Sequence, residues 1–132
     1  MATPEGIGSQ VRRRLAEQRT LVERLLRLRD QLGGSLFQRY GLCGKQGCAC
    51  RRGRRHGPYY VLATRRSGQA GFAYLAAGQA AQARQLVAQH RRFRAGLGRL
   101  RGVNRRLVVL LKQYQTAASK RAGQRLGLAA AP

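Results

Sequence analysis

Apolar residues recur every three or four positions near the start of the chain, which is the spacing of one face of a helix. The stripe consists of Val11, Leu15, Leu21, Leu25, Leu28 and Leu32. Ser9 suits the N-cap of this helix and Gly33 its C-terminal stop. The pattern therefore predicts a helix over residues 9–32, preceded by a flexible segment of residues 1–8.

The spacing changes to alternation between residues 35 and 76. Three short segments, residues 35–40, 59–64 and 71–75, are rich in aromatic and β-branched side chains and are separated by glycine-rich turns. They predict a small three-stranded antiparallel sheet. Residues 65–69 form the expected hairpin tip.

The most regular pattern lies in the last third of the chain, where spacings of four and three alternate from Gln79 to Ala118. A seam of this heptad type predicts a long, coiled-coil-like helix over residues 78–118. The seam includes Leu86, Phe93, Leu97, Leu100, Asn104, Leu107 and Leu111. We expect the long helix to pack against the first one, and its excess length makes the seam a candidate homodimer surface.

Several residues of the long helix have their own interpretation. Gly96, Gly98 and Gly102 each weaken a helix interior by about 1 kcal/mol relative to alanine, so two nearly collinear helices are an alternative. Asn104 is expected to be a buried polar residue that fixes register. His90 lies on the same seam and is expected to be a structural, partly buried side chain.

These elements predict an α+β fold within a single domain of residues 9–118. Its parts are the first helix (9–32), a module that holds the sheet and the cysteines (35–76) and the long helix (78–118). Residues 119–132 are expected to form a disordered basic tail, because basic residues stand there among alanine and glycine.

Charge narrows the range of functions. The 132 residues include 27 Lys and Arg but only four Asp and Glu, which gives a net charge of +23. A compact particle of this size carries such a charge at a cost in self-repulsion, and a polyanionic partner relieves it. We therefore expect a nucleic acid as partner, since arginine suits bidentate phosphate contacts and stacking on bases.

The few acidic residues exclude most catalytic classes. Glu5, Glu17, Glu23 and Asp30 are the complete set, so residues 31–132 contain no side-chain carboxylate. Two-metal nucleases and glycosidases need several facing carboxylates, and triad chemistry needs an orienting acid. The expected function is therefore non-enzymatic, with no small-molecule substrate.

The sequence also bears on location. No stretch approaches the roughly 18 apolar residues of a membrane span, and residues 1–10 lack the apolar core of a signal peptide. Three clustered cysteines, an odd number, argue against a secreted disulfide framework. We expect the protein in the cytoplasm, with no membrane partner.

The candidate chemistry lies between the first two predicted strands. Three thiolates and one imidazole complete the tetrahedral shell of a structural zinc ion, and this loop supplies them as Cys43, Cys48, Cys50 and His56. We predict one zinc ion per chain. Because no Cys-x-x-Cys pair is present, reduced cysteines without metal, iron–sulfur ligation and a reactive thiol stay as alternatives. Basic neighbours in the loop are expected to lower the thiol pKa values.

Basic and aromatic residues around this loop are the candidate contacts with nucleic acid. Arginines would bind phosphates and tyrosines would stack on unpaired bases. The set comprises Arg39, Lys45, Arg51, Arg52, Arg54, Arg55, Tyr59, Tyr60, Arg65, Arg66, Arg91, Arg92 and Arg94. Because successive strand residues point to opposite faces, at most one of Tyr59 and Tyr60 can face a ligand, and the other is expected to fill the core.

Two motifs resemble those of a known family. They are Cys43-Gly44-Lys45 followed by Cys48 and Cys50, and His56-Gly57-Pro58-Tyr59-Tyr60. They are similar to motifs of small, basic, uncharacterised bacterial and archaeal proteins, a domain of unknown function often found beside transposase and other mobile-element genes. The resemblance covers about residues 33–112, and it implies a metal-stapled module in a mobile-element setting.

The preferred hypothesis is a zinc-stapled nucleic-acid-binding protein, a DNA-binding accessory of a mobile element. The family setting favours DNA over RNA. The alternatives are an RNA-binding module and an oligomeric adaptor whose coiled-coil seam recruits a transposase or another protein. The enzymatic alternative is a phosphodiester transfer through Tyr59 or Tyr60 assisted by a metal-free His56.

Overall fold

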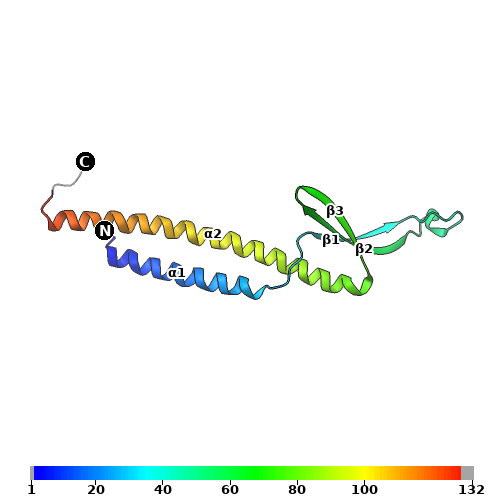
Figure 1. Ribbon diagram of the computed structural model, residues 1–132, viewed down its shortest axis with the longest axis horizontal. Helices are drawn as coiled ribbons and strands as arrows, with labels where there is room; N and C mark the ends of the chain where they lie inside the picture. The colour runs from blue at the N-terminus through cyan, green and yellow to red at the C-terminus, as the bar shows by residue number, and fades with distance from the viewer. Residues whose placement is uncertain (1, 129–132) are drawn as a thin grey trace. The chain divides into compact units, whose positions relative to one another are not determined.

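The computed structural model describes residues 2–128, apart from the side chain of Arg66. Along the chain it contains helix α1 (Pro4–Arg27), strand β1 (Ser35–Gly41), the short 3₁₀ helix η1 (Ala49–Arg52), strands β2 (His56–Arg66) and β3 (Gln69–Leu75), and helix α2 (Ala77–Arg125) (Figure 1). The strands form one antiparallel sheet in the order β1-β2-β3. The predicted α+β fold, with an N-terminal helix, a three-stranded sheet and a long C-terminal helix, is confirmed.

The chain divides into two compact units, whereas the sequence predicted one domain. The helical unit comprises residues 1–27 and 94–132, of which 2–27 and 94–128 are described. The sheet unit comprises residues 28–93. The boundary falls within α2, because the residues before it belong with the sheet and the residues after it pair with α1.

Helix α1 begins and ends earlier than predicted. Thr3 caps it by accepting hydrogen bonds from the backbone N–H groups of Gly6 and Ile7, at 3.2 and 3.0 Å, and Pro4 takes the first helical position. This start signal is stronger than Ser9, so the expected flexible segment of residues 1–8 is mostly helical. The helix ends at Arg27 because the chain beyond it makes tertiary contacts in the sheet unit.

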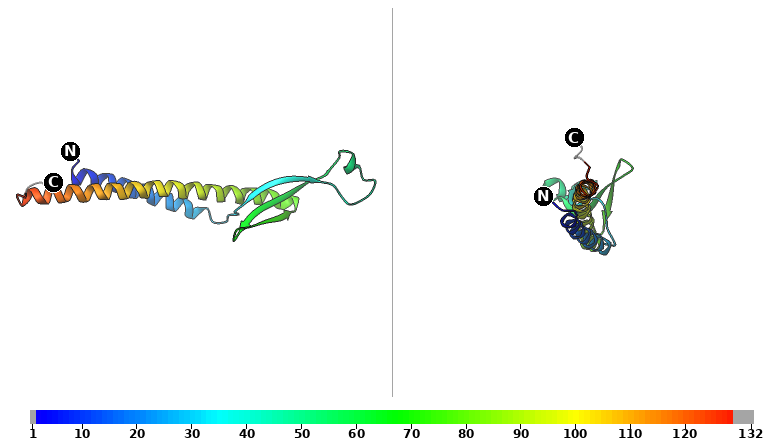
Figure 2. Two further views of the ribbon diagram at one scale, coloured as in Figure 1. Left: turned by 90° about the horizontal axis from the view of Figure 1, so that it is seen from above. Right: turned by 90° about the vertical axis from the view of Figure 1, so that its left-hand side faces the viewer.

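Within the helical unit, α1 runs antiparallel to the second half of α2, and Figure 2 shows the pair in two perpendicular views. Gln18 Nε2 donates a hydrogen bond of 2.7 Å to Asn104 Oδ1, and Arg121 pairs with Glu5 farther along the same register. The buried apolar residues of this unit are Ile7, Leu25, Val103, Leu107 and Leu110. The expected packing of the long helix on the first is confirmed.

Helix α2 is continuous through the segment where glycines allowed a break. Gly96 has a packing role that explains its presence: a Cβ built there would collide with the buried side chain of Leu25 in α1. The helix also continues past residue 118 to Arg125, so the expected disordered tail is wrong for residues 119–125. Alanine and long-chain basic residues favour helix there. Residues 129–132 lie outside the described chain.

The buried stripe of α2 differs from the predicted heptad seam. Of the seam residues, Leu107 is buried, Leu86, Phe93, Leu97 and Leu100 are half-buried, and Asn104 and Leu111 are exposed. The buried positions are instead Ala80, Ala83 and Val87 in the sheet unit and Val103, Leu107 and Leu110 in the helical unit. A strict heptad drifts around a straight helix by about 20° per repeat. The seam therefore cannot stay on one face when the helix has different partners at its two ends.

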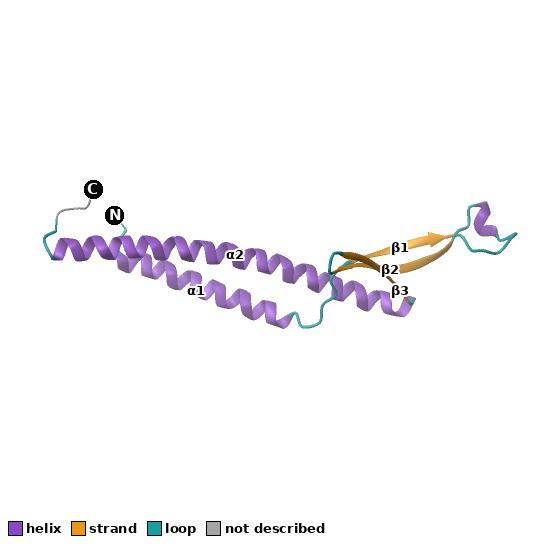
Figure 3. Cartoon of the chain, turned by 45° about the horizontal axis from the view of Figure 1, so that its top comes forward, coloured by secondary structure: helices purple, strands orange, loops and turns teal. Residues whose placement is uncertain are grey.

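The sheet is larger than predicted but has the expected connections. Strands β2 and β3 meet at a two-residue turn in which Ser67 and Gly68 both have positive φ, 51° and 78°. This type I′ geometry matches the twist of a hairpin. Figure 3 shows that the β1–β2 loop, which carries η1, extends beyond the end of the strands.

One face of the sheet is covered by the first part of α2. The strand register places the side chains of four sheet residues on this face, namely Leu36, Tyr60, Leu62 and Leu75. Leu36 and Tyr60 line a small cavity together with Val87 of α2. The opposite face carries Phe37, Tyr59, Val61, Phe72 and Tyr74.

The segment between α1 and β1 is tied to α2. The Leu32 backbone N–H donates to the Leu86 carbonyl at 3.1 Å, and the ring of half-buried His90 lies against Gly33. His90 is thus a packed side chain, as predicted. Over the residues described, neither α1 nor α2 contains a stretch long and apolar enough to cross a membrane.

Candidate metal centre

Four potential metal ligands meet at the β1–β2 loop. Cys43, Cys48 and Cys50 come from the loop, and His56 is the first residue of β2. Their ligand atoms all lie within 4.8 Å of one another. The Sγ atoms of Cys43 and Cys50 are 3.5 Å apart, and Cys48 Sγ lies 3.3 Å from His56 Nε2. The four residues can hold a metal ion, as the sequence predicted.

The local backbone explains why these side chains converge. Cys48 stands at the N-cap of η1, and its carbonyl accepts the Arg51 backbone N–H at 3.2 Å. This tight turn brings Cys50 back toward Cys43, whose backbone N–H donates to Cys50 Sγ at 3.4 Å. Gly53, with φ of 108°, ends η1 in a left-handed conformation that favours glycine. The chain then returns to β2 and His56.

Hydrogen bonds within the cluster shift two thiol pKa values in opposite directions. The Cys50 backbone N–H, followed by the side chains of Cys43, Cys50 and His56, lowers the pKa of Cys48 to about 6. The Lys45 backbone N–H acts to lower the pKa of Cys43, but the Cys48 and Cys50 side chains and burial outweigh it, so this pKa is raised. The expected general lowering by basic side chains is therefore wrong for Cys43, because neighbouring thiols dominate.

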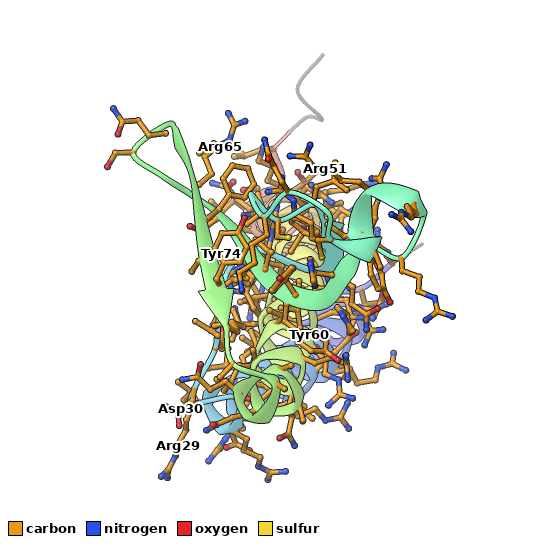
Figure 4. The ribbon with its side chains drawn as sticks, turned by 90° about the vertical axis from the view of Figure 1, so that its right-hand side faces the viewer. Arg29, Asp30, Arg51, Tyr60, Arg65 and Tyr74 are labelled. Carbon is orange, nitrogen blue, oxygen red and sulfur yellow. The ribbon has the colours of Figure 1, made fainter. Side chains whose placement is uncertain are left out.

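The predicted basic contacts are exposed. This holds for Arg39, Lys45, Arg51, Arg52, Arg54, Arg55, Arg65, Arg91, Arg92 and Arg94. Figure 4 labels Arg51, which belongs to η1 and directly follows Cys50 in the chain. The predicted contact Arg66 lies outside the described side chains. Every ion pair found among the described residues lies in the helical unit, so the exposed arginines of the sheet unit are not neutralised by acidic side chains there.

Tyr59 and Tyr60 lie on opposite faces of the sheet, as the alternation of strand residues predicted. Tyr59 is exposed, whereas Tyr60 is half-buried against α2 and lines the cavity there. Figure 4 shows Tyr60 on the side of the sheet nearer α2, and Tyr74 and Arg65 farther from that helix. Of the two tyrosines, only Tyr59 is available for stacking.

Three exposed aromatic residues were missed at the sequence level. They are Phe37, Phe72 and Tyr74, which share a face with Tyr59. Phe72 and Tyr74 stand two residues apart on a strand that alternates with small residues, and this spacing indicated a common face. Their alignment with Phe37 depends on the strand register, which the sequence does not reveal.

Comparison with known proteins identifies the class of this chain. Residues 10–85 of the chain match a family described as a domain of unknown function, DUF6788. The matched segment includes the Cys/His cluster at the end of the sheet. The chain belongs to this family. No curated protein and no solved structure gives a match.

Proposed function

We propose that this protein is a non-enzymatic nucleic-acid-binding module, stapled by one structural zinc ion, that serves a mobile element as a DNA-binding accessory. The observation that carries the proposal is the Cys/His cluster within a loop of exposed, unneutralised arginines. The mobile-element setting rests on the motif resemblance, and the preference for DNA follows from that setting.

The geometry of the cluster supports zinc. A tetrahedral site with Zn–S distances of about 2.3 Å and a Zn–N distance of about 2.0 Å has ligand–ligand edges of about 3.5–3.8 Å. Cys43 Sγ lies 3.5 Å from Cys50 Sγ and Cys48 Sγ lies 3.3 Å from His56 Nε2, and the whole set lies within 4.8 Å. Small side-chain movements therefore suffice to close a tetrahedron. Three thiols and one imidazole are also the donor types that zinc prefers.

The loop needs such a staple because it has almost no apolar core. Among residues 42–55, Cys50 alone is buried. Five basic side chains repel one another in the same segment, namely Lys45, Arg51, Arg52, Arg54 and Arg55. A metal ion bound by thiolates would compensate for both deficits, because the binding energy of a structural zinc contributes directly to folding.

Charge supports a nucleic-acid partner. The sheet unit contains twelve basic residues and one acidic residue, Asp30. Phosphate neutralisation by arginine would relieve the repulsion within the loop and release counterions from the nucleic acid. A duplex or a single strand meets this requirement, whereas a neutral small molecule does not.

Metal content tests the zinc part. Protein purified without a chelating tag should contain one zinc per chain by mass spectrometry, and Cys48→Ser and His56→Ala should lose it. His90→Gln is the matched control, because His90 belongs to the same unit but lies outside the cluster. Folded wild-type protein without zinc would refute this part of the proposal.

Two fourfold variants of equal charge test the binding part. One replaces Arg51, Arg52, Arg54 and Arg55 with alanine, and the other replaces the exposed Arg99, Arg101, Arg105 and Arg106 of α2. The loop variant should bind duplex DNA more weakly. The negative slope of log K against log salt should become shallower, by up to about 4. The helix variant should lose less at the same net charge. Equal losses would show that total charge, not the loop, determines binding.

A second candidate function, an oligomeric adaptor, is supported by exposed apolar side chains of the helical unit. Leu15 and Leu26 on α1 are 48 and 70 % exposed, and Val108 and Leu111 on α2 are both 51 % exposed. Apolar side chains of this kind can mark a surface that binds another helix. Sedimentation of the wild-type protein tests it: a dimer dissociated by Leu26→Ser and Val108→Ser would support the adaptor, and a monomer would oppose it.

A further inference from the structure

The face of the sheet opposite α2 carries half of the eight aromatic residues of the chain. Phe37, Tyr59, Phe72 and Tyr74 are 41, 46, 67 and 61 % exposed, respectively. Two arginines accompany them on this side of the strands. We name this surface the aromatic face and define it by Phe37, Arg39, Tyr59, Arg65, Phe72 and Tyr74.

The strand register places these side chains together. Val61 in the central strand stands opposite Phe37 of β1 and Tyr74 of β3. Two residues before Val61 on β2, Tyr59 stands opposite Arg39 of β1. Two residues after Val61, Ala63 stands opposite Phe72 of β3. Side chains of directly opposed residues lie on the same face of a sheet. The rings of three strands therefore surround one small central residue.

The rings form an ordered layer. Val61 is only 2 % exposed, although it lies on the face that α2 does not cover. The surrounding side chains shield it, and Arg39 Nη1 donates a 2.9 Å hydrogen bond to Tyr74 Oη, from β1 across β2 to β3. This bond fixes the guanidinium and the phenol of opposite edge strands. The aromatic face thus presents flat apolar rings beside fixed positive charge.

We propose that the aromatic face binds the unpaired bases of single-stranded DNA. This proposal rests on the proposed function and names the form of nucleic acid that the sheet recognises. Base–aromatic stacking accepts any base, since each has a π-face, and arginine contributes both phosphate contacts and cation–π stacking. Arg39 and Arg65 supply that charge at two places on the face.

The spacing of the rings favours a single strand over a duplex. Phe72 and Tyr74 are two residues apart on β3, which corresponds to about 7 Å along the strand. Neighbouring bases in a duplex are stacked about 3.4 Å apart and are enclosed by their pairing, so protein rings cannot reach their faces. Only bases that have left the stack can lie on rings at this separation.

Charge disfavours a second copy of the chain as the occupant. Pairing two aromatic faces would bring Arg39 and Arg65 of both copies together. Residues 31–132 contain no side-chain carboxylate to compensate them. Like charges that meet across an interface oppose association, whereas phosphates neutralise the same arginines.

A tryptophan placed on the aromatic face gives a direct reporter, because the chain contains no tryptophan. In Phe72→Trp, oligo-dT should quench the indole fluorescence by stacking on it, and a duplex of matched length should leave it nearly unchanged. Tyr114→Trp, at an exposed aromatic position on α2, is the matched control and should respond to neither. Equal quenching at both positions would overturn the proposal.

Affinity measurements complete the test. Phe72→Ala/Tyr74→Ala should weaken oligo-dT binding by about 10- to 100-fold at about 0.15 M salt, while duplex binding stays within about twofold. Tyr74→Phe keeps the ring but removes the bond to Arg39, so it should retain most of the affinity. Both sites lie on an edge strand and are exposed, and circular dichroism checks that the variants fold.

The outcomes separate this proposal from the proposed function. If the loop arginine variant loses duplex binding while the aromatic variants bind oligo-dT like the wild type, the single-strand proposal fails and the proposed function stands. If no nucleic acid binds at this salt concentration, both fail. Tighter binding of oligo-U than oligo-dT would overturn the choice of DNA, and a wild-type dimer that dissociates in Phe72→Ala/Tyr74→Ala would make the aromatic face a protein interface.

Discussion

The helical unit and the sheet unit have nearly the same charge but very different chemistry. Each covers 66 residues, with net charges of +12 and +11. Seven of the eight aromatic residues, all three cysteines and both histidines belong to the sheet unit. Charge alone therefore does not locate the functional surface. The aromatic residues and metal ligands that accompany the charge distinguish the sheet unit.

The two units also differ in how many of their basic side chains form ion pairs with acidic ones. In the helical unit, all three acids pair with arginine, as Arg14–Glu17, Arg19–Glu23 and Arg121–Glu5. Exposed pairs of this kind each stabilise a fold by about 0–1 kcal/mol, so their main effect is to reduce local repulsion. The sheet unit has one acid, and its arginines stay available to an external anion. This contrast suits a structural role for the helices and a binding role for the sheet.

The largest effect expected is on the metal. Removal of zinc by a chelator should abolish protection from amide hydrogen exchange in residues 43–56 and leave α1 protected, because zinc contributes about 10–16 kcal/mol in small zinc-folded domains and the loop has little other core. Exchange measured by mass spectrometry separates the two units. Unchanged exchange in the loop after zinc removal would contradict a structural role for the metal.

The second-largest effect is expected from a substitution at Gly34, a glycine of the sheet unit. Gly34 has φ of 136°, and a Cβ there would collide with the Ala63 carbonyl oxygen and lie 3.2 Å from Thr64 Cγ2. Gly34→Ala should therefore lower the free energy of unfolding by about 2–4 kcal/mol, as measured by chemical denaturation. Gly41→Ala is the matched control, since a Cβ at Gly41 meets nothing within 4 Å. Similar losses in both variants would show that the close contact at Gly34 is not what matters.

The sequence predicted what depends on residue type and local period. The three strands, the placement of Tyr59 and Tyr60 on opposite faces, and the meeting of Cys43, Cys48, Cys50 and His56 all follow from alternation, from glycine-rich turns and from the shared chemistry of the ligands. These features involve residues close together in the chain. Local rules therefore suffice for them.

What the sequence could not predict depends on contacts between distant residues. Helix α1 stops before Leu32 because the backbone N–H of Leu32 donates a hydrogen bond to the carbonyl of Leu86, which lies 54 residues later in the chain. Gly96 is tolerated in α2 because Leu25 fills the space beside it. The aromatic face needs the register of three strands, which places Phe37 and Tyr74 on either side of Val61. Tertiary partners, rather than propensity, decide each of these features.

A pair of glycine variants in the helical unit sharpens the comparison at a smaller scale. Gly96→Ala should lower stability by about 1 kcal/mol, because Leu25 is buried and must move to admit the methyl group. Gly98→Ala, with nothing within 4 Å of its Cβ, should raise stability by about 1 kcal/mol through helix propensity. Thermal unfolding by circular dichroism measures both. Stabilisation by both substitutions would show that α1 and α2 do not pack closely at Gly96.

The smallest effect concerns Asn104, for which the sequence and the structure give different roles. The heptad pattern made it a buried residue that fixes the register of a coiled coil, and its replacement would then change the oligomeric state. In the structure, Asn104 is exposed and accepts a hydrogen bond from Gln18 of its own chain. Asn104→Leu should therefore cost about 0.5–1 kcal/mol and leave the sedimentation mass unchanged. A double-mutant cycle with Gln18→Leu should return a coupling free energy of about 0.5–1 kcal/mol between the two side chains. A hydrogen bond within one chain cannot determine how many chains associate. A change of sedimentation mass in Asn104→Leu would therefore place this residue between chains and support the adaptor hypothesis.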